Sequence, residues 1–387
     1  MKVYEAVANA FVKEGTSAVF GLLGDGQLSW WSAIAKHPGV QIVDAREEGA
    51  GLAMAEGWAK ATGKVGVCSV THGPGLARLS LSLIAARRSH TPIVVHTSKT
   101  AFNNERETQF LNQDRFVSAS EAGYIEVMTP DYAETAVRQA FYRARLESRP
   151  IVLCIPLDIQ GEECESDGDE YQPSATMFAG QQRIRPDVDR LRAAVKIISE
   201  AKKPVVVLGR GAMEPQARQA ADRLAKRIGA LIATTLLARG VLGESEYYAG
   251  VSGTLSARAV IQLFEEADCV IAIGAGLNDR TIQGGYLYPH ARIIHIDIEP
   301  HLMMGNDRSA DCYVQGDAAT TTQEIDEMLA QQGVAREGFR TAAVRNVLRN
   351  AHRDPSEFEI EPGTVDPREA VRVLDDGLPS SVGLVIG

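Results

Sequence analysis

The chain has 387 residues, of which 45% are hydrophobic and 6% aromatic, and its formal net charge at pH 7 is −10. This length suffices for two or three ordinary domains, and the composition is typical of a globular α/β protein. The negative charge argues against a nucleic-acid partner, because binding to a polyanion requires a basic surface.

The five cysteines form no CxxC pair, and Cys68, Cys154 and Cys269 lie inside apolar, strand-like runs. We therefore expect buried thiols in a reducing compartment rather than a disulfide framework. The N-terminus has the pattern of an amphipathic helix without the apolar core of a signal peptide, and no apolar run is long enough to span a bilayer. These features predict a cytoplasmic protein with no membrane partner.

The first 160 residues alternate between short apolar runs and runs with helical periodicity. Strands are predicted at 18–23, 41–44, 65–70, 93–96 and 150–155. Helices are predicted at 48–62, 76–87 and 132–146. Strands of this kind, separated by helices, indicate a doubly wound α/β domain over residues 1–160, with a parallel sheet covered on both faces.

The composition then changes. Residues 161–170 contain six acidic residues and two glycines, and we interpret 161–185 as a solvated linker. A second doubly wound, Rossmann-like α/β domain is predicted over 186–335. Its predicted strands are 204–208, 231–234, 269–273 and 292–298, and its predicted helices are 188–201, 214–228, 257–267 and 318–329.

The last part of the chain is charged and contains several prolines. We interpret residues 336–365 as a second linker. Beyond it, residues 366–375 predict a helix and 382–386 a strand. We therefore interpret 366–387 as the start of a third domain.

A glutamate at the start of a helix rich in small residues is the most informative motif. The run REEGAG at 46–51 leads into EGWA at 56–59, and the turn Gly73-Pro74-Gly75 follows about ten residues after the helix. Small residues allow close packing of the helix, and a carboxylate at its start can cap free N–H groups. Close packing does not require Glu48, however, and burial of a carboxylate without a partner is costly.

Residues 44–75 resemble the pyrimidine-binding domain of thiamine-diphosphate enzymes of the acetolactate synthase and benzoylformate decarboxylase group. The resemblance implies that Glu48, eight residues before the EGWA segment, hydrogen-bonds a ring nitrogen of the cofactor's aminopyrimidine. Glu47 lacks this spacing. Acid–base work at that ring requires a carboxyl group. The resemblance also implies that Gly73, Pro74 and Gly75 lie against the aminopyrimidine.

The resemblance suggests three candidates on the substrate side: His72, Gln113 and Gly24. A histidine at a strand end is often structural. Gln113 resembles a family glutamine that reaches the active site from a loop, and Gln109 is the competing choice. Family members usually carry an asparagine shortly after the glycine turn. Arg78 stands in that region here, either meeting an anionic group or pointing to solvent.

The segment Gly24-Asp25-Gly26 imitates the family's signature for a metal-bound diphosphate. The second ligand of that signature is an asparagine, and none occurs between Asn9 and Asn103. We interpret the segment as the family's glycine turn facing a partner subunit, and we assign no metal ligand to this chain. The resemblance implies that Mg²⁺ and the diphosphate bind in a C-terminal domain. We expect that domain to be truncated after its start at 366–387, with a separate polypeptide as the alternative.

Two glycine turns end predicted strands of the second domain, Gly209-Arg210-Gly211 and Gly274-Ala275-Gly276. Neither has the full GxGxxG spacing of a dinucleotide site. The domain resembles the family's central domain, which binds FAD in acetolactate synthases and is empty in many relatives. Arg210, Gly211, Gly274 and Gly276 are therefore candidate nucleotide contacts, with packing between domains as the default interpretation.

The resemblance thus implies a thiamine-diphosphate-dependent 2-oxo acid decarboxylase or carboligase, similar to acetolactate synthase. It implies a homodimer or homotetramer with the cofactor between subunits, and a chain that is inactive alone. The alternatives are a non-enzymatic nucleotide-binding module and one subunit of a two-chain thiamine-diphosphate enzyme. An NAD-dependent oxidoreductase is disfavoured, because neither domain has the full fingerprint followed by an acidic residue about 20 positions later.

Overall fold

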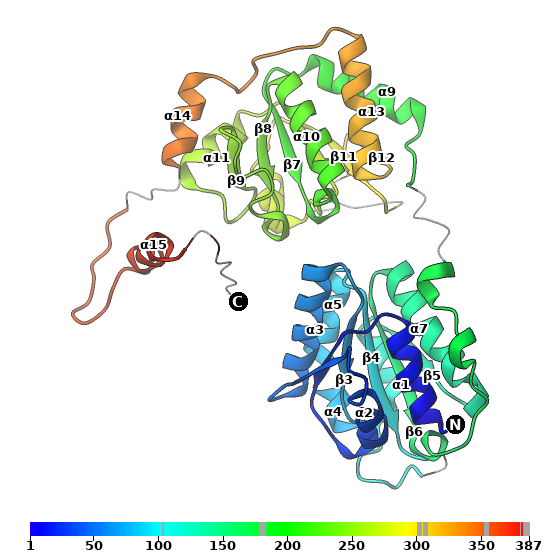
Figure 1. The fold of residues 1–387 in the computed structure, drawn as a ribbon. Coiled ribbons are helices and arrows are strands. Elements are labelled where there is room, and N and C mark those ends of the chain that lie inside the picture. Colours follow the sequence, from blue (N-terminus) through cyan, green and yellow to red (C-terminus); the bar gives the residue numbers. More distant parts are fainter. Residues whose placement is uncertain are drawn as a thin grey trace. The chain divides into compact units, whose positions relative to one another are not determined.

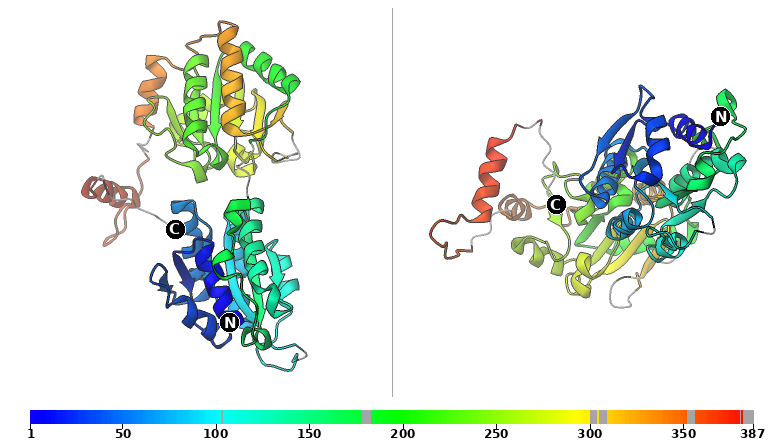
Figure 2. Two further views of the ribbon diagram at one scale, coloured as in Figure 1. Left: turned by 45° about the vertical axis from the view of Figure 1, so that its right-hand side comes forward. Right: turned by 90° about the horizontal axis from the view of Figure 1, so that it is seen from below.

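The computed structural model describes residues 1–102, 104–177, 183–299, 304, 309–351, 356–379 and 381. The chain divides into two compact units, Met1–Gln181 and Gln182–Gly387. Each unit contains a six-stranded parallel sheet with helices on both faces (Figures 1 and 2). The prediction of two doubly wound α/β domains is therefore confirmed. No helix in these described ranges is both long and apolar enough to cross a membrane.

The sheet of the first unit has the order β2-β1-β3-β4-β6-β5. Its strands are β1 (Ala18–Gly21), β2 (Gln41–Asp44), β3 (Gly66–Ser69), β4 (Ile93–Lys99), β5 (Gly123–Glu126) and β6 (Pro150–Pro156). Its α-helices are α1 (Val3–Lys13), α2 (Leu28–Ile34), α3 (Glu48–Thr62), α4 (Pro74–Ala77), α5 (Ser80–Arg88), α6 (Gln113–Ala119), α7 (Ala133–Glu147) and α8 (Leu157–Gln160). Its 3₁₀ turns are η1 (Asp25–Gln27), η2 (Pro130–Tyr132), η3 (Gly168–Glu170) and η4 (Ser174–Met177).

The core of this unit consists of two layers, because successive strand residues point to opposite faces of the sheet. Val19 and Val67 pack with α1, α2 and α7 on one face. Phe20 and Cys68 pack with α3 and α5 on the other. Burial on both faces explains why these strands are continuous apolar runs in the sequence.

The predicted helix at 76–87 is instead two helices, α4 and α5. Between them the backbone forms a 3₁₀-type turn, in which the Leu79 amide donates to the Leu76 carbonyl, three residues earlier, at 3.0 Å. Among the helices and strands of this unit, α2, α6, α8 and β5 had no prediction. Helices α2 and α6 have seven residues each, and β5 is a four-residue edge strand with alternating burial. Elements this short give weak periodic signals.

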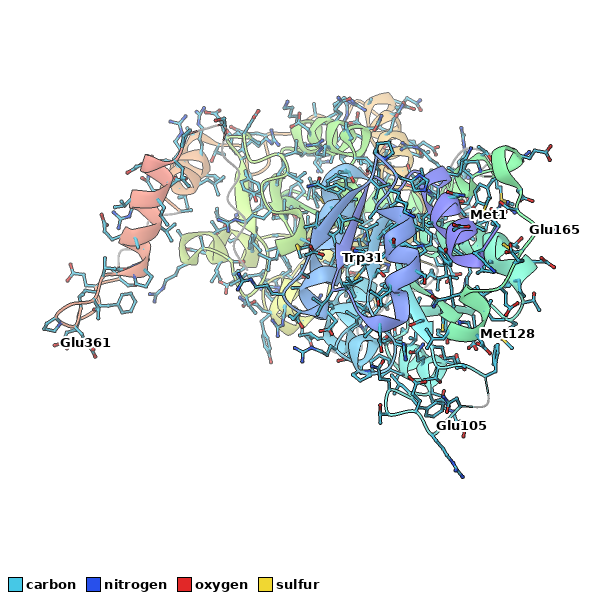
Figure 3. The ribbon with its side chains drawn as sticks, turned by 60° about the horizontal axis from the view of Figure 1, so that its bottom comes forward. Met1, Trp31, Glu105, Met128, Glu165 and Glu361 are labelled. Carbon is cyan, nitrogen blue, oxygen red and sulfur yellow. The ribbon has the colours of Figure 1, made fainter. Side chains whose placement is uncertain are left out.

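The predicted acidic linker differs from the structure in its first part. Tyr171 and Ser174 are buried, and the Tyr171 hydroxyl and the Ser174 amide donate to the Glu14 carboxylate at 3.0 and 2.7 Å. The Cys164 amide donates to the Met1 carbonyl at 2.9 Å, and Figure 3 shows Met1 near the labelled Glu165. The segment packs on the rest of the first unit because Glu14, the buried C-cap residue of α1, supplies acceptors that composition alone does not reveal.

The sheet of the second unit has the order β12-β11-β10-β7-β8-β9. Its strands are β7 (Pro204–Leu208), β8 (Leu231–Thr234), β9 (Tyr248–Val251), β10 (Cys269–Ile273), β11 (Arg292–Asp297) and β12 (Cys312–Gln315). Its α-helices are α9 (Val188–Glu200), α10 (Pro215–Ile228), α11 (Arg258–Glu265), α12 (Asp279–Ile282), α13 (Ala318–Gln331) and α14 (Ala342–Asn350). Its 3₁₀ turns are η5 (Arg210–Ala212), η6 (Leu236–Ala238) and η7 (Gln283–Gly285). Helices α9, α10 and α13 pack on one face, and α11 and α14 on the other.

The predicted linker at 336–365 also contains structure. Helix α14 lies within it, and Phe339 and Leu348 are buried in the same core layer as α11. The helix predicted at 366–375 is present as α15 (Pro367–Gly377). The strand predicted at 382–386 lies outside the described residues.

Candidate functional site

The candidate site lies where the strand order of the first sheet reverses. Strand β1 pairs in parallel with both β2 and β3, so the loops after β1 and β3 leave the sheet in opposite directions. In doubly wound sheets, ligands bind in the crevice that forms outside the carboxyl ends of the strands at such a point. Gly24 follows β1, Glu48 follows β2, and the turn Gly73-Pro74-Gly75 follows β3. The topology therefore brings these predicted residues to one edge of the sheet.

Glycines permit the loops at this edge of the sheet to approach one another closely. A Cβ atom on Gly24 would lie 2.5 Å from the Thr71 Cβ. Gly73 has a φ of +61°, and a Cβ atom there would lie 1.9 Å from the Gln109 carbonyl oxygen. Only glycine adopts this conformation and this separation without strain. The turn after β3 is thus held between the turn after β1 and the loop after β4.

Glu48 begins α3 but does not cap it. The N-cap is Glu47, whose carboxylate accepts a hydrogen bond from the Ala50 amide. The Glu48 side chain is only 14% exposed, and its Oε2 pairs with the Arg78 Nε at 2.9 Å. A Cβ atom on Gly75 would lie 3.7 Å from the Glu48 Oε1. The structure therefore brings Glu48 and the glycine turn together and assigns the capping role to its neighbour.

Arg78 meets an anionic group, the first of the two alternatives considered above. It follows α4 directly, and its side chain is 60% exposed. Besides the contact with Glu48, its Nη2 lies 3.4 Å from Oε2 of Glu47. Sequence reasoning did not identify this pairing, because it depends on the approach of α3 to the turn after β3.

His72 lies behind the turn, with only 1% of its surface exposed. Its Nδ1 is 2.8 Å from the Ser98 hydroxyl, and its Nε2 is 3.6 Å from the Glu107 carboxylate. A Cβ atom on Gly26 would lie 2.4 Å from the His72 Nδ1. The turn after β1 thus covers this ring.

Gln113 holds the glycine turn to the sheet. It is buried, its Oε1 accepts a hydrogen bond from the Gly73 amide at 3.0 Å, and its Nε2 donates to the Ser98 carbonyl at 2.9 Å. Gln109, the competing choice, instead donates to the Asp25 carboxylate at 3.2 Å. Both glutamines therefore bind the loops that form the crevice.

Asp25 is bound by donors of its own chain. Burial acts to raise the pKa of this carboxyl, but hydrogen bonds from the Thr71 hydroxyl, the Gly26 amide and Gln109 outweigh burial and keep the pKa below its ordinary value. These contacts tie the turn Gly24-Asp25-Gly26 to Thr71 and Gln109 of the neighbouring loops.

The two glycine turns of the second unit pack on each other. The Gly211 amide donates to the Gly274 carbonyl at 2.9 Å. A Cβ atom on Gly209 would lie 2.1 Å from the same carbonyl, and one on Gly274 would lie 2.5 Å from the Gly211 Cα. Close backbone packing therefore explains these glycines. Gly276 has an open neighbourhood, and Arg210 is exposed near the opposite charge of Asp297.

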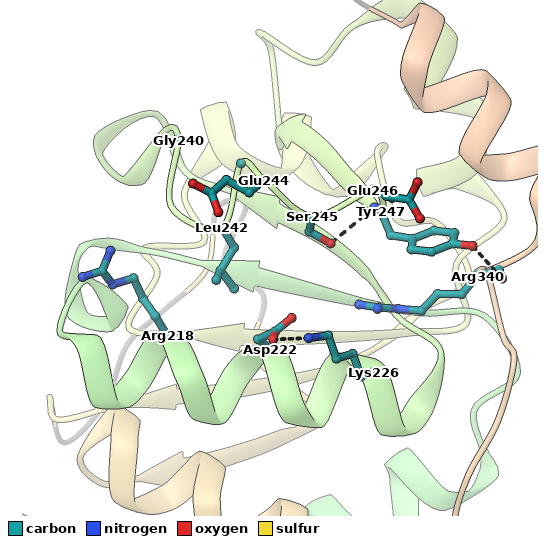
Figure 4. A pocket seen from close by; sticks show the side chains of 11 residues that line it. Arg218, Asp222, Lys226, Gly240, Leu242, Glu244, Ser245, Glu246, Tyr247 and Arg340 are labelled. Carbon is teal, nitrogen blue, oxygen red and sulfur yellow. Dashed lines mark hydrogen bonds and ion pairs between the residues drawn. The ribbon is translucent and has the colours of Figure 1, made fainter. Parts of the chain in front are cut away.

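A different part of the second unit contains an open pocket of about 560 Å³ (Figure 4). It lies between α10 and the segment 240–247, and Arg340 extends into it over the Tyr247 ring, 5.0 Å from the ring centroid. Lys226 pairs with Asp222 at 2.6 Å, and the Tyr247 hydroxyl donates to the Arg340 carbonyl. The predicted nucleotide contacts do not line this pocket.

Comparisons with known proteins match both units. Residues 1–119 match the family model of the thiamine pyrophosphate enzyme N-terminal TPP binding domain, and residues 191–325 match that of the thiamine pyrophosphate enzyme central domain. The acetolactate synthase large subunit of Parasynechococcus marenigrum is 29% identical over 392 residues, covering 97% of this chain and 62% of the relative. That of Corynebacterium glutamicum is 30% identical over 327 residues, covering 81% and 50%.

Among solved structures, a candidate thiamin diphosphate-dependent enzyme from Mycobacterium smegmatis superposes with a TM-score of 0.70. The match covers 85% of this chain and 62% of that protein, and at 23% sequence identity it supports the fold alone. The chain spans about half to two thirds of the length of the curated relatives that it matches.

Proposed function

Because the chain belongs to the thiamine pyrophosphate enzyme family and carries its N-terminal and central domains, we propose that it is part of a thiamine-diphosphate-dependent enzyme acting on 2-oxo acids. The reaction would be decarboxylation, or carboligation of the acetolactate synthase type. One observation carries this proposal: the largely buried Glu48 carboxylate lies beside the glycine turn, within the N-terminal TPP binding domain.

The crevice fits the aminopyrimidine part of the cofactor. The turn at Gly73 and Gly75 presents backbone without side chains, and the Glu48 Oε1 lies near the position that a Cβ on Gly75 would take. Such a surface suits a flat heterocycle with a hydrogen-bonding edge. When bound, thiamine diphosphate supplies an electron sink for the carbon that loses carbon dioxide.

The residues of this chain have distinct roles in the proposal. Glu48 holds a ring nitrogen of the aminopyrimidine and moves a proton at that atom. The turn from Gly73 to Gly75 orients the ring. Gln113 fixes that turn through the Gly73 amide, while Gly24 and His72 shape the substrate side from the adjoining loops.

Further parts of the proposal concern the whole protein. We expect Mg²⁺ and the cofactor's diphosphate to bind outside residues 1–365, and the cofactor to lie between subunits of a homodimer or homotetramer. We place the protein in the cytoplasm, an assignment supported by five cysteines that are all free and buried. FAD in the second unit is a weaker proposal, because mutual packing explains Gly209, Gly211 and Gly274.

The test uses the full-length protein. Calorimetric titration with thiamine diphosphate and Mg²⁺ measures binding, and carbon dioxide release from a panel of 2-oxo acids measures activity. We expect Glu48→Gln to lower turnover by about 10²–10⁴-fold, the usual contribution of a general acid–base group. Glu56→Gln is the matched control, because Glu56 lies on the same helix and its side chain is 15% exposed. Wild-type turnover in Glu48→Gln would reject the proposed role.

A further inference from the structure

The position of Arg78 is set by the turn that forms the crevice. Arg78 is the C-cap of α4, three residues after Gly75, and its amide donates to the Pro74 carbonyl at 3.2 Å. From this position its guanidinium reaches across to the start of α3. The element that carries the glycine turn therefore also carries a cation that faces the neighbouring carboxylates.

The guanidinium bridges two consecutive glutamates through different nitrogen atoms. Its Nε lies 2.9 Å from the Glu48 Oε2, and its Nη2 lies 3.4 Å from the Glu47 Oε2. Glu47 is itself held in place, because its other oxygen accepts from the Ala50 amide. A planar guanidinium anchored in this way restricts the conformations of the Glu48 side chain.

The two oxygens of Glu48 thereby have different surroundings. Oε2 is engaged by Arg78, whereas Oε1 lies on the side of Gly75, 3.7 Å from the position of a Cβ there. We propose that Arg78 is a positioning residue, which holds Oε2 of Glu48 so that Oε1 faces the aminopyrimidine. This inference rests on the proposed function and extends it to a residue that departs from the family's usual asparagine.

Ordinary surface pairing does not account for this contact. Arg88 and Glu121 form such a pair on the same unit, at 3.5 Å, with side chains 74% and 53% exposed. Pairs of this kind contribute little to stability. Arg78 is exposed as well, but it contacts a carboxylate that is only 14% exposed and stands at the candidate site. Its removal would leave the Glu48 side chain free to rotate away from the crevice.

The experiment measures cofactor affinity separately from activity. In the full-length protein, calorimetry gives the dissociation constant of thiamine diphosphate at fixed Mg²⁺, and steady-state kinetics give the KM for the 2-oxo acid. We expect Arg78→Gln to weaken cofactor binding about tenfold, which corresponds to a loss of about 1.4 kcal/mol. The KM for the 2-oxo acid should stay near the wild-type value, because Arg78 acts through Glu48.

Three further variants separate positioning from a structural effect. Arg78→Lys should recover part of the affinity, because an ammonium group keeps the charge but lacks the planar fork that bridges both carboxylates. Glu47→Gln keeps an oxygen for the Ala50 amide while removing one anchor of Arg78, so an intermediate loss of affinity is expected. Arg88→Gln is the matched control and should bind the cofactor as the wild type does.

The outcomes distinguish this inference from the proposed function. Wild-type or tighter cofactor binding by Arg78→Gln, with Glu48→Gln still impaired, would overturn the role of Arg78 and leave the proposed function standing. A wild-type protein that neither binds thiamine diphosphate nor consumes 2-oxo acids would overturn both. If Arg78→Gln does not fold, Arg78→Lys and Glu47→Gln decide: unchanged affinity in both would overturn the inference.

Discussion

Gln113 accepts a hydrogen bond from the Gly73 amide at 3.0 Å across 40 positions of the sequence. Because its Nε2 also donates to the Ser98 carbonyl, both ends of this buried amide are used. Gln113→Ala removes the acceptor of the Gly73 amide and one donor to the Ser98 carbonyl, at a cost of about 1–3 kcal/mol for a buried group left unsatisfied. Urea unfolding should therefore show a lower free energy of unfolding. Gln109→Ala is the control, since the Gln109 side chain donates to the exposed Asp25 carboxylate. An equal loss in both variants would contradict the special role of Gln113.

Gly73→Ala should be among the most damaging changes in the first unit. The residue has a φ of +61°, and the added Cβ would lie 1.9 Å from the Gln109 carbonyl oxygen, so backbone must move. Gly57 offers the opposite case, because it lies in α3 with nothing within 4 Å of a Cβ. Gly57→Ala should raise the free energy of unfolding by up to about 1 kcal/mol, the difference in helix propensity. Thermal unfolding of the two variants should give shifts of opposite sign; shifts of the same sign would contradict this account.

His96 should make the first unit less stable in mild acid. Its ring stacks on Trp30 with centroids 3.9 Å apart, and burial lowers its pKa to about 3. The unfolded chain takes up this proton near pH 6.5, so it binds more protons than the folded chain between pH 6.5 and about 3. Stability contributed by the neutral ring is therefore full above pH 6.5 and falls as the pH decreases, by up to about 1.4 kcal/mol per pH unit.

Urea unfolding at pH 7.5, 6.0 and 5.0 measures this effect above the range in which most carboxyl groups titrate. His96→Phe keeps a flat ring against Trp30 but cannot be protonated. We expect the variant to lose less stability than the wild type between pH 7.5 and 5.0. Parallel profiles for the two proteins would show that His96 is not the source of the pH dependence.

Glu14 should fix the segment after α8 to the first unit. Its buried carboxylate accepts from Tyr171 and Ser174 and pairs with Arg145 at 3.1 Å. Removal of one partner of a buried pair costs about 3–5 kcal/mol. Glu14→Ala should therefore lower the free energy of unfolding and expose residues 162–177 to proteases. A wild-type digestion pattern would support the sequence-based interpretation of this segment as a solvated linker.

Much of the fold followed from the sequence because both faces of each sheet are buried. Strands β7 and β10 have the predicted bounds, since all their residues are apolar and buried. The strands without a prediction, β5, β9 and β12, lie at sheet edges and mix buried residues with partly or fully exposed ones. Four residues with such a pattern resemble a polar loop.

The contacts of the candidate site likewise include some that the sequence predicted and some that it did not. The proximity of Glu48 to the glycine turn was expected from the family resemblance, and the structure brings these residues together. The pairing of Arg78 with Glu48 and the burial of Glu14 were not expected, because each depends on a charged side chain meeting segments distant in sequence. Sequence periodicity carries information about neighbours on one helix or strand, not about contacts between separate elements.

The proton function of Glu48 can be measured at the cofactor itself. In the full-length protein with saturating thiamine diphosphate and Mg²⁺, nuclear magnetic resonance can follow hydrogen–deuterium exchange at the cofactor carbon between nitrogen and sulfur. The account predicts that Glu48→Gln slows this exchange by about 10²–10⁴-fold, while Glu56→Gln exchanges as the wild type does. Equal exchange rates in the wild type and in Glu48→Gln, with each protein saturated with cofactor, would contradict the proton function of Glu48.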